Sequence, residues 1–271
     1  MFVFVALSGL TSSSAQDLLP LNLQFLGDQG HHQPARRAAE LLPALSQRGI
    51  NVKYSEDIAS VLTANNLAKL DGLIVYANID HISDEQAKAL LEFVNDGGGF
   101  LPLHCASFCF RNNEEIVALM GAQFQRHGTG TFTVSPTSVG ESHPLMKGYR
   151  SFESWDETYV HTKHNEKNRT VLEYRQEGDQ REPWTWVRNE GKGRVFYTAS
   201  GHDERVWKQP AFHQLLKAGI LWSVGNERKQ SYEEFIAERA PLKYEKRGDI
   251  ANYENRPEPL PYQFPLKAED S

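Results

Sequence analysis

The stretch GLIVYANIDHISDEQAKALLEFVNDGGGFLPLHC, residues 72–105, contains the pattern that decides the fold. Residues 73–76 are apolar on both faces, as a strand buried inside a parallel sheet requires. A helix is predicted to open at Ser83, where Gln86 completes a capping box, and its inward stripe consists of Ala87, Leu90, Leu91 and Val94. The glycines at 97–99 end that helix, and residues 100–103 form the next strand. This order of strand, helix and strand indicates a parallel β-α-β unit.

The same alternation extends to both sides of this unit. Upstream, residues 21–26 and 50–54 are predicted strands, and the helix between them carries its apolar stripe on Ala38, Leu41, Leu42 and Leu45. Downstream, we predict helices over 113–120 and 211–224 and strands over 129–135, 170–174, 184–188 and 194–198, with a hairpin turn at Gly191-Lys192-Gly193. The chain is therefore expected to be an α/β protein, with a mostly parallel central sheet between two layers of helices.

The composition excludes several classes of protein. Hydrophobic residues make up 39% and charged residues 24% of the 271 residues, which is typical of a globular chain rather than a disordered one. Lys and Arg number 29 against 35 Asp and Glu, and the resulting net charge of −6 argues against a nucleic-acid partner. No apolar run approaches the roughly 20 residues of a membrane span. Two cysteines are too few for a disulfide scaffold.

The two ends of the chain differ from the domain between them. Residues 1–10, MFVFVALSGL, are apolar, and Ser13 and Ala15 are small residues where a signal peptidase would cut. We therefore predict a signal peptide over 1–15 and export to the periplasm, although no basic residue precedes the apolar run and a buried first strand is the alternative. From residue 227 the chain is polar and dotted with prolines, so 227–271 is predicted to be an extended arm or linker. Residues 16–226 then form one α/β domain.

Histidines recur where the predicted strands end. Ligands of an open parallel sheet bind beyond the carboxyl ends of its strands. His31 and His32 follow the first strand, His104 follows the strand at 100–103, and His202 follows the strand at 194–198. We expect these side chains to share one pocket. The alternative is that each of them only satisfies a buried hydrogen bond.

A second polar cluster is Trp155-Asp156-Glu157-Thr158-Tyr159, in which two acids lie between aromatic rings. Aromatic rings can stack on the apolar face of a pyranose while carboxylates accept hydrogen bonds from its hydroxyls. A carboxylate beside apolar surface can also have its pKa raised toward acid–base use. The cluster therefore indicates a sugar site, and the alternative is an ordinary strand edge with its aromatic rings packed inward.

Several motifs together resemble the ThuA-like, or trehalose-utilisation, family. They are Gly30-His31-His32, FLPLHCA at 100–106, WDETY at 155–159 and GRVFYTASGHD at 193–203, the last followed by Trp207 and by PAFHQLLKAGILW at 210–222. The resemblance covers roughly residues 21–225. It implies a flavodoxin-like, three-layer α/β/α sandwich of the class I glutamine-amidotransferase-like type.

The resemblance also bears on the cysteines. In glutaminases of that fold, a cysteine nucleophile follows a strand in a G-x-C-x-G elbow. Here His104 has the position of the nucleophile, and Cys105 comes one residue later, where its side chain points the other way. The histidine and acid of the glutaminases correspond to His202 and Glu204. Glutamine hydrolysis is thus disfavoured, and Cys105 and Cys109 are expected to be buried thiols. A thiol hydrolase using Cys105 is the alternative.

The family implies carbohydrate metabolism, around trehalose-like disaccharides and their 3-keto derivatives. We expect an exported enzyme that acts on a glucoside or 3-keto-glucoside by His and Glu acid–base chemistry, with a sugar oxidoreductase as a partner. A non-catalytic carbohydrate-binding module that docks on such an oxidoreductase is the alternative. The predicted catalytic residues are His202, His104, Glu157 and Asp203, and the predicted substrate-binding residues are His31, His32, Trp155, Tyr159, Glu204 and Trp207.

Two further expectations concern His202 and its neighbours. Asp203 or Glu204, which follow His202 directly, would accept a hydrogen bond from its ring, orient it and fix its tautomer. His31, His104 and His202, together with Glu157, would also supply three nitrogens and an oxygen for a divalent metal such as Zn²⁺.

Overall fold

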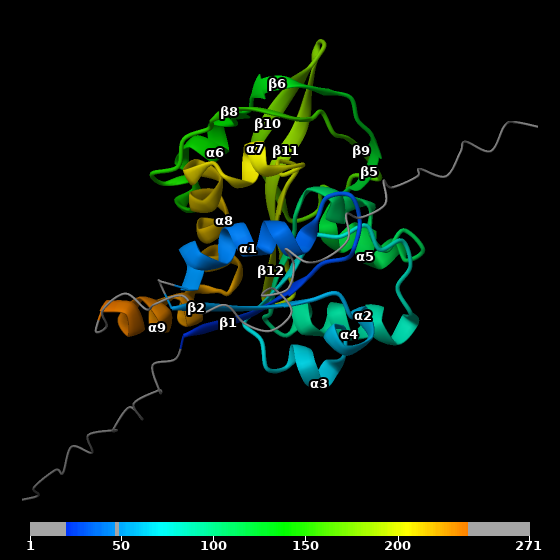
Figure 1. The fold of residues 1–271 in the computed structure, drawn as a ribbon, viewed down its shortest axis with the longest axis vertical. Helices are drawn as coiled ribbons and strands as arrows, with labels where there is room; N and C mark the ends of the chain where they lie inside the picture. Colours follow the sequence, from blue (N-terminus) through cyan, green and yellow to red (C-terminus); the bar gives the residue numbers. More distant parts are fainter. Residues whose placement is uncertain (1–19, 47–48, 238–271) are drawn as a thin grey trace, which may run out of the picture.

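A single mixed sheet organises the molecule (Figure 1). The computed structural model describes residues 20–46 and 49–237, so the predicted signal peptide at 1–15 and the chain from 238 to 271 lie outside the described residues. The sheet has eight strands in the order β2-β1-β3-β4-β12-β11-β10-β7. Neighbours from β2 to β12 are parallel, and β11, β10 and β7 continue the sheet in antiparallel pairs. The strands are β1 (Leu21–Leu26), β2 (Ile50–Ser55), β3 (Gly72–Val75), β4 (Gly99–Pro102), β7 (Ser135–Pro136), β10 (Arg169–Glu177), β11 (Gln180–Glu190) and β12 (Gly193–Thr198).

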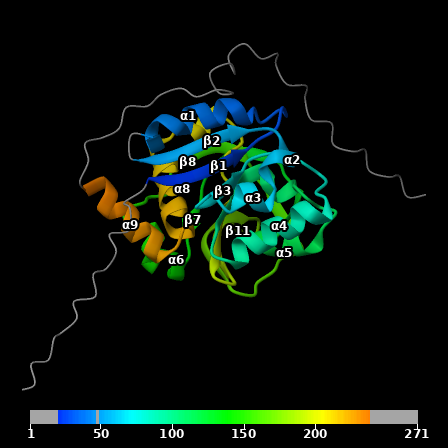
Figure 2. The same ribbon diagram turned by 90° about the horizontal axis from the view of Figure 1, so that it is seen from below.

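Helices cover both faces of the sheet because alternate strand residues are apolar on each side. Ile74, Leu101 and Phe196 pack into one core with α1 (Pro34–Ser46) and α8 (Pro210–Ser223). Leu73, Phe100 and Val195 pack into the other with α4 (Asp84–Asn95) and α5 (Glu114–Met120). Figure 2 shows α1 on one side of β1 and β2 and the short α2 (Ile58–Val61), α3 (Ala64–Leu67) and α4 on the other. The predicted flavodoxin-like, three-layer α/β/α sandwich is confirmed.

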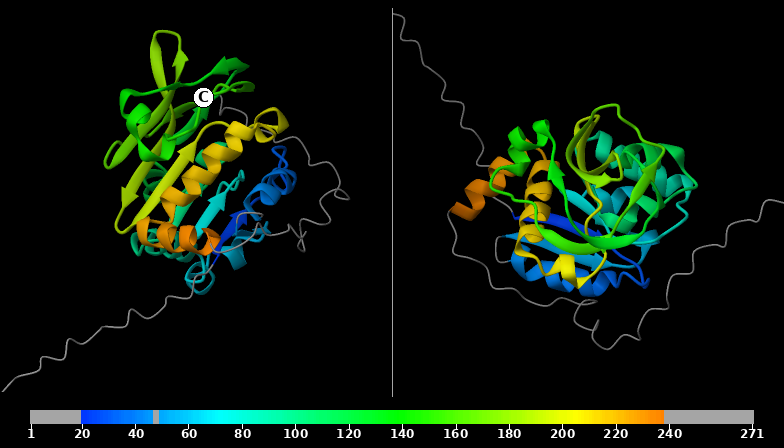
Figure 3. Two further views of the ribbon diagram at one scale, coloured as in Figure 1. Left: turned by 90° about the vertical axis from the view of Figure 1, so that its left-hand side faces the viewer. Right: turned by 90° about the horizontal axis from the view of Figure 1, so that it is seen from above.

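Antiparallel strand pairs stand beyond the parallel strands, at the top of Figure 1. They include β6 (Thr129–Thr133) paired with β8 (Glu153–Glu157), β5 (Gln123–Arg126) paired with β9 (Val160–Thr162), and the long β10–β11 pair. The sequence predicted β6 but not β5, β8 or β9. The short α6 (Ser138–Ser142) follows β7 and packs on β10, and the short α7 (Glu204–Trp207) follows β12 and packs on β8. Figure 3 shows α8 running alongside β12 beneath this region.

Local signals in the sequence account for several element boundaries. The predicted capping box forms at the start of α4: Ser83 Oγ accepts from Gln86 N at 3.3 Å, and Gln86 Oε1 accepts from Ser83 N at 2.9 Å. Asn113 caps α5 with a single hydrogen bond, which its side chain accepts from Ile116 N at 3.1 Å. Among the described residues, no helix is both long and apolar enough to cross a membrane.

The prediction of an extended segment from residue 227 is wrong for its first part, because residues 226–237 form helix α9 (Asn226–Ala237). Tyr232 and Phe235 are buried on this helix, and Phe235 packs against Gly49. Arg228 fixes its start through an ion pair with Asp71 at 2.7 Å. Two buried aromatic rings and one ion pair dock the helix without the long apolar stripe by which a helix is recognised in sequence.

A buried carboxyl in β10 makes the stability of the fold pH-dependent. Glu173 is fully buried and accepts hydrogen bonds from Ser151 Oγ at 2.9 Å and Thr185 Oγ1 at 2.7 Å. Burial raises the pKa of Glu173 above that of an exposed glutamate. The folded state thus favours the protonated carboxyl, and this favourable contribution is lost as the pH rises through the raised pKa.

Glu173→Gln is uncharged at every pH and should escape that loss. We expect the melting temperature of the variant, measured relative to the wild type, to be higher at pH 8 than at pH 4. Thermal unfolding followed by circular dichroism at both pH values checks this. A difference in melting temperature that does not change with pH would contradict the assignment of a raised pKa to Glu173.

Candidate metal centre

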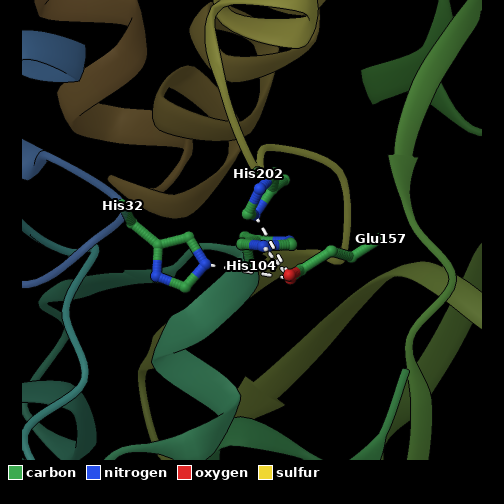
Figure 4. A group of neighbouring side chains, drawn as sticks. All are labelled: His32, His104, Glu157 and His202. Atoms are coloured by element: carbon green, nitrogen blue, oxygen red, sulfur yellow. Dashed lines mark hydrogen bonds and ion pairs between the residues drawn. The ribbon is translucent and has the colours of Figure 1, made fainter. Parts of the chain in front are cut away.

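Four side chains from separate elements converge at the carboxyl end of the parallel strands (Figure 4). His32 lies in the loop after β1, His104 begins a 3-10 turn after β4, His202 lies in the loop after β12, and Glu157 ends β8. One nitrogen or oxygen atom from each of them lies within 4.8 Å of the others. We call these residues the His₃Glu cluster. Parallel strands bring three of its members to one edge of the sheet, and the antiparallel β6–β8 pair supplies the fourth.

The ring of His104 presents a lone pair to the cluster. Its Nδ1 lies 2.6 Å from the backbone oxygen of Ala199, and because a carbonyl can only accept, Nδ1 donates. Burial lowers the pKa of His104, so the ring is neutral and its Nε2 carries no proton. That Nε2 lies 3.2 Å from Glu157 Oε2. The Tyr159 ring stacks on the imidazole at 4.3 Å between centroids and holds its plane.

His32 repeats this arrangement. Its Nδ1 is 2.8 Å from Asn78 Oδ1, and because an amide oxygen accepts, Nδ1 donates. Burial lowers the pKa of His32 to about 4, which leaves Nε2 unprotonated. This nitrogen finds no hydrogen-bond partner among the described residues, although it is fully buried and lies 3.8 Å from Glu157 Oε2.

The carboxylate of Glu157 stands between these rings and His202. Burial alone would raise the pKa of Glu157, but the imidazoles around it lower it well below the ordinary value, so the group is ionised. His202, whose own pKa is raised, is the ring that can carry the balancing positive charge. His202 Nδ1 lies 3.2 Å from Glu157 Oε1, outside the alignment of a hydrogen bond. Burial would lower the pKa of His202, whereas the charge of Glu157 raises it overall.

These contacts fit a bound cation. Two neutral imidazoles turn lone pairs toward an ionised carboxylate, which is an unfavourable contact between acceptors unless a positive ion lies among them. Three nitrogens and a carboxylate oxygen form a ligand set of the kind that binds Zn²⁺ and other first-row divalent metals. Asn78 and the carbonyl of Ala199 would be the outer partners that fix the tautomers of two ligands.

Comparison with known proteins places the chain in a family. A family model named ThuA and described as "Trehalose utilisation" matches residues 23–223. This chain belongs to the ThuA family. The predicted membership is therefore confirmed. No curated protein matches the chain.

Solved structures agree on the fold of this ThuA-family chain. It resembles a putative ThuA-like protein from Bacteroides uniformis with a TM-score of 0.65 and 18% identity, covering 79% of this chain and 95% of that one. It also resembles a putative ThuA-like protein from Parabacteroides merdae with a TM-score of 0.64 and 19% identity, covering 76% and 90% of the two chains. At these identities the likeness bears on the fold alone.

The ThuA-family site differs from the predicted ligand set at its first histidine. His32, rather than His31, joins His104, His202 and Glu157. The His31 ring contacts that of His32 in a tilted arrangement, at 3.9 Å between centroids, and lies 6.4 Å from that of His202. The His31 ring thus lies beside the cluster, but the ligating atom comes from His32. Burial and the neighbouring His32 lower the pKa of His31 to about 4.

The expected carboxylate partners of His202 lie elsewhere, because Glu157 takes that position. Asp203 caps α7 by accepting from Arg205 N at 2.9 Å, and it also pairs with the Arg205 side chain. Glu204 pairs with Arg37 at 3.0 Å. The prediction that Asp203 or Glu204 orients the His202 ring is therefore wrong, since the start of α7 turns both side chains to other partners.

The three aromatic residues predicted to bind substrate have different environments. Trp155 is half-buried, 5.7 Å from the His202 ring between centroids, and the Arg205 guanidinium lies 3.5 Å above it. Tyr159 is buried against His104, and Trp207 is fully buried with its Nε1 donating to Gly201 O at 2.8 Å. Tyr159 and Trp207 therefore contact the side chains and backbone of the site itself, and their contact with a substrate stays a prediction.

Three residues near the cluster were not predicted as site residues. His127, between β5 and β6, brings its Nε2 to 3.5 Å from Glu157 Oε1. Asn78 holds His32, as described above. Asp156 is buried next to Glu157, and burial raises its pKa to about 7. The WDETY motif signalled Asp156, whereas His127 and Asn78 lie in loops whose course the sequence does not define.

Cys105 is placed as a structural thiol. It is fully buried in the core, and burial raises the pKa of its thiol well above the usual range, which disfavours the reactive thiolate. His104 has the position at the end of β4 instead, with the left-handed φ of 46° that suits a sharp turn after a strand. The structure therefore argues against the thiol-hydrolase alternative.

Cys105→Ala is expected to leave metal content and turnover nearly unchanged, because the thiol does not reach the His₃Glu cluster. Steady-state kinetics and metal analysis of the purified variant check this. A covalent adduct of Cys105 with a substrate or inhibitor, detected by mass spectrometry, would restore the thiol-hydrolase interpretation.

Proposed function

We propose that this ThuA-family chain is a metal-dependent enzyme that acts on a sugar at the His₃Glu cluster. One observation carries the proposal: lone pairs of buried imidazoles and an ionised carboxylate point at a common centre. One ligating atom from each of the four residues lies within 4.8 Å of the others. A structural histidine would instead direct each ring nitrogen to a complementary partner.

The cluster has a closed floor and a more open rim. His32 and His104 are fully buried, whereas the His202 side chain is 21% exposed. A divalent ion held there would act as a Lewis acid on an oxygen of the substrate. His202, the most exposed member, marks the side from which that oxygen enters. The ionised Glu157 offsets the charge of the cation, and the buried rings exclude water from the opposite side.

The proposed substrate is a glucoside or 3-keto-glucoside of the trehalose type. The family description, trehalose utilisation, supports the sugar class. The half-buried Trp155 beside His202 supports it as well, because an indole ring at the rim can stack on a pyranose. A keto sugar is the form whose carbonyl oxygen a Lewis acid polarises most directly. Such a substrate requires an oxidoreductase that supplies it, and we propose that this partner acts with the chain in the periplasm.

Metal analysis combined with turnover tests the proposal. Full-length protein purified without chelators is expected to contain about one divalent ion per chain. Turnover of 3-keto-trehalose should disappear after chelation and return with added Zn²⁺, and unmodified trehalose is tested in parallel. Equal turnover by metal-free protein would contradict the metal-dependent function. Sugar binding without turnover by the metal-loaded protein would favour the carbohydrate-binding module.

A further inference from the structure

The carboxylate of Asp156 joins the two segments that carry Glu157 and His202. It accepts hydrogen bonds from three backbone N–H groups: Glu157 N at 2.9 Å, His202 N at 3.1 Å and Gly201 N at 3.0 Å. Neighbouring residues of a strand point to opposite sides, so Asp156 reaches this backbone while Glu157 reaches the imidazoles. One buried side chain thus links the end of β8 to the loop after β12, which lie 45 residues apart in sequence.

The same loop is held from its other side. Tyr76 donates its hydroxyl to Gly201 O at 2.6 Å and lies 3.2 Å from His202 O. Trp207 Nε1 donates to Gly201 O at 2.8 Å. Gly201 has a φ of 135°, a conformation that favours glycine, so its N–H can face Asp156 while its C=O faces Tyr76 and Trp207. The backbone at 201–202 is therefore bound at both its donor and its acceptor groups.

We infer that Asp156 is a positioning residue that sets the metal affinity of the His₃Glu cluster by fixing Glu157 and His202 relative to each other. The inference rests on the proposed metal-dependent function. Asp156 acts through backbone N–H groups and not through the ligating atoms. Preorganised ligands bind a metal tightly because little conformational freedom is lost on binding. Residues that orient the ligands of a metal typically change its affinity by about 10–100-fold when they are mutated.

Asp156→Asn tests this with little change in volume. Both carboxylate oxygens accept from backbone N–H groups, so the amide nitrogen that this substitution introduces would face one of these N–H groups. Two hydrogen-bond donors would then point at each other, and at least one hydrogen bond would be lost. We expect Zn²⁺ to bind about 10–100-fold more weakly, as measured by competition with a chromophoric chelator. The absorption spectrum of the Co²⁺-loaded protein should also change, because the ligand geometry around the ion changes. General destabilisation without a positioning role would lower the melting temperature but leave that spectrum as in the wild type.

Tyr76→Phe provides a second test should Asp156→Asn fold poorly, because it deletes one oxygen atom on the opposite side of the loop. It should weaken Zn²⁺ binding several-fold in the same assay. Glu173→Gln is the matched control, because it also neutralises a fully buried carboxyl. That carboxyl bonds to the hydroxyl groups of Ser151 and Thr185 and to no part of the cluster, so the variant should keep wild-type Zn²⁺ affinity. Wild-type Zn²⁺ affinity in both Asp156→Asn and Tyr76→Phe would overturn this inference but leave the proposed function standing. A wild-type chain that binds no metal would overturn the proposed function, and this inference with it.

Discussion

His202→Ala is expected to abolish stoichiometric metal binding and to lower kcat/KM by about 10²–10⁴-fold. His202 is the most exposed member of the His₃Glu cluster, and its Nδ1 lies 3.2 Å from Glu157 Oε1. Its removal takes away one of three nitrogen ligands without opening a large apolar cavity. The melting temperatures of the metal-free variant and the metal-free wild type should therefore be close, whereas metal analysis and kinetics should separate the two proteins.

Two further variants make this prediction specific. His202→Gln should fail to restore turnover, because an amide cannot take up a proton and is a poor substitute for an imidazole ligand. His81→Ala is the matched control. Like His202, His81 lies in a loop at the carboxyl edge of the sheet, here after β3, but its side chain is 79% exposed and pairs with Asp80. It should retain metal and turnover. If His202→Ala kept full metal content and activity but unfolded at a lower temperature, His202 would be a structural residue.

The sequence predicted the layered sheet because its signals are local. Residues 73–76 are apolar on both faces, and Ser83 with Gln86 marks a helix start, so the strands and helices around them follow without knowledge of tertiary contacts. Helix α9 was missed because Tyr232 and Phe235 dock it through contacts with the rest of the domain, including Gly49. Strand β8 was missed because its pairing with β6 brings together residues far apart in sequence.

The site was predictable to the extent that it follows from the parallel sheet. His104 and His202 each follow a parallel strand directly, and their ring centroids lie 5.9 Å apart. The choice between His31 and His32 depends on the direction of a loop side chain, which no sequence pattern specifies. Glu157 reaches the cluster from β8, whose partner β6 lies far from it in sequence, so the WDETY motif indicated its chemistry but not its position. The orientation of Asp203 and Glu204 was likewise decided by Arg205 and Arg37, which the sequence does not place.

The two tryptophans that the sequence assigned to substrate binding should respond to mutation in opposite ways. Trp207 is fully buried, its ring centroid lies 4.9 Å from that of Tyr76 and 5.2 Å from that of Phe212, and its Nε1 bonds to Gly201 O. Trp207→Ala should lower the free energy of unfolding by about 3–5 kcal/mol, because it leaves a large cavity and removes one of the two hydrogen bonds to Gly201 O. In a domain of this size, that corresponds to a melting temperature lower by roughly 6–20 °C.

Trp155→Ala provides the contrast, because that ring is half-buried at the rim and its main contact is the Arg205 guanidinium at 3.5 Å. A cation–π contact at an exposed position contributes about 0.5–1 kcal/mol, so the melting temperature should fall by no more than about 2–4 °C. If Trp155 stacks on the sugar, its loss should raise KM. Thermal unfolding and kinetics of both variants therefore separate support of the fold from contact with the ligand. A raised KM with an unchanged melting temperature for Trp207→Ala would contradict the supporting role and return Trp207 to the substrate site.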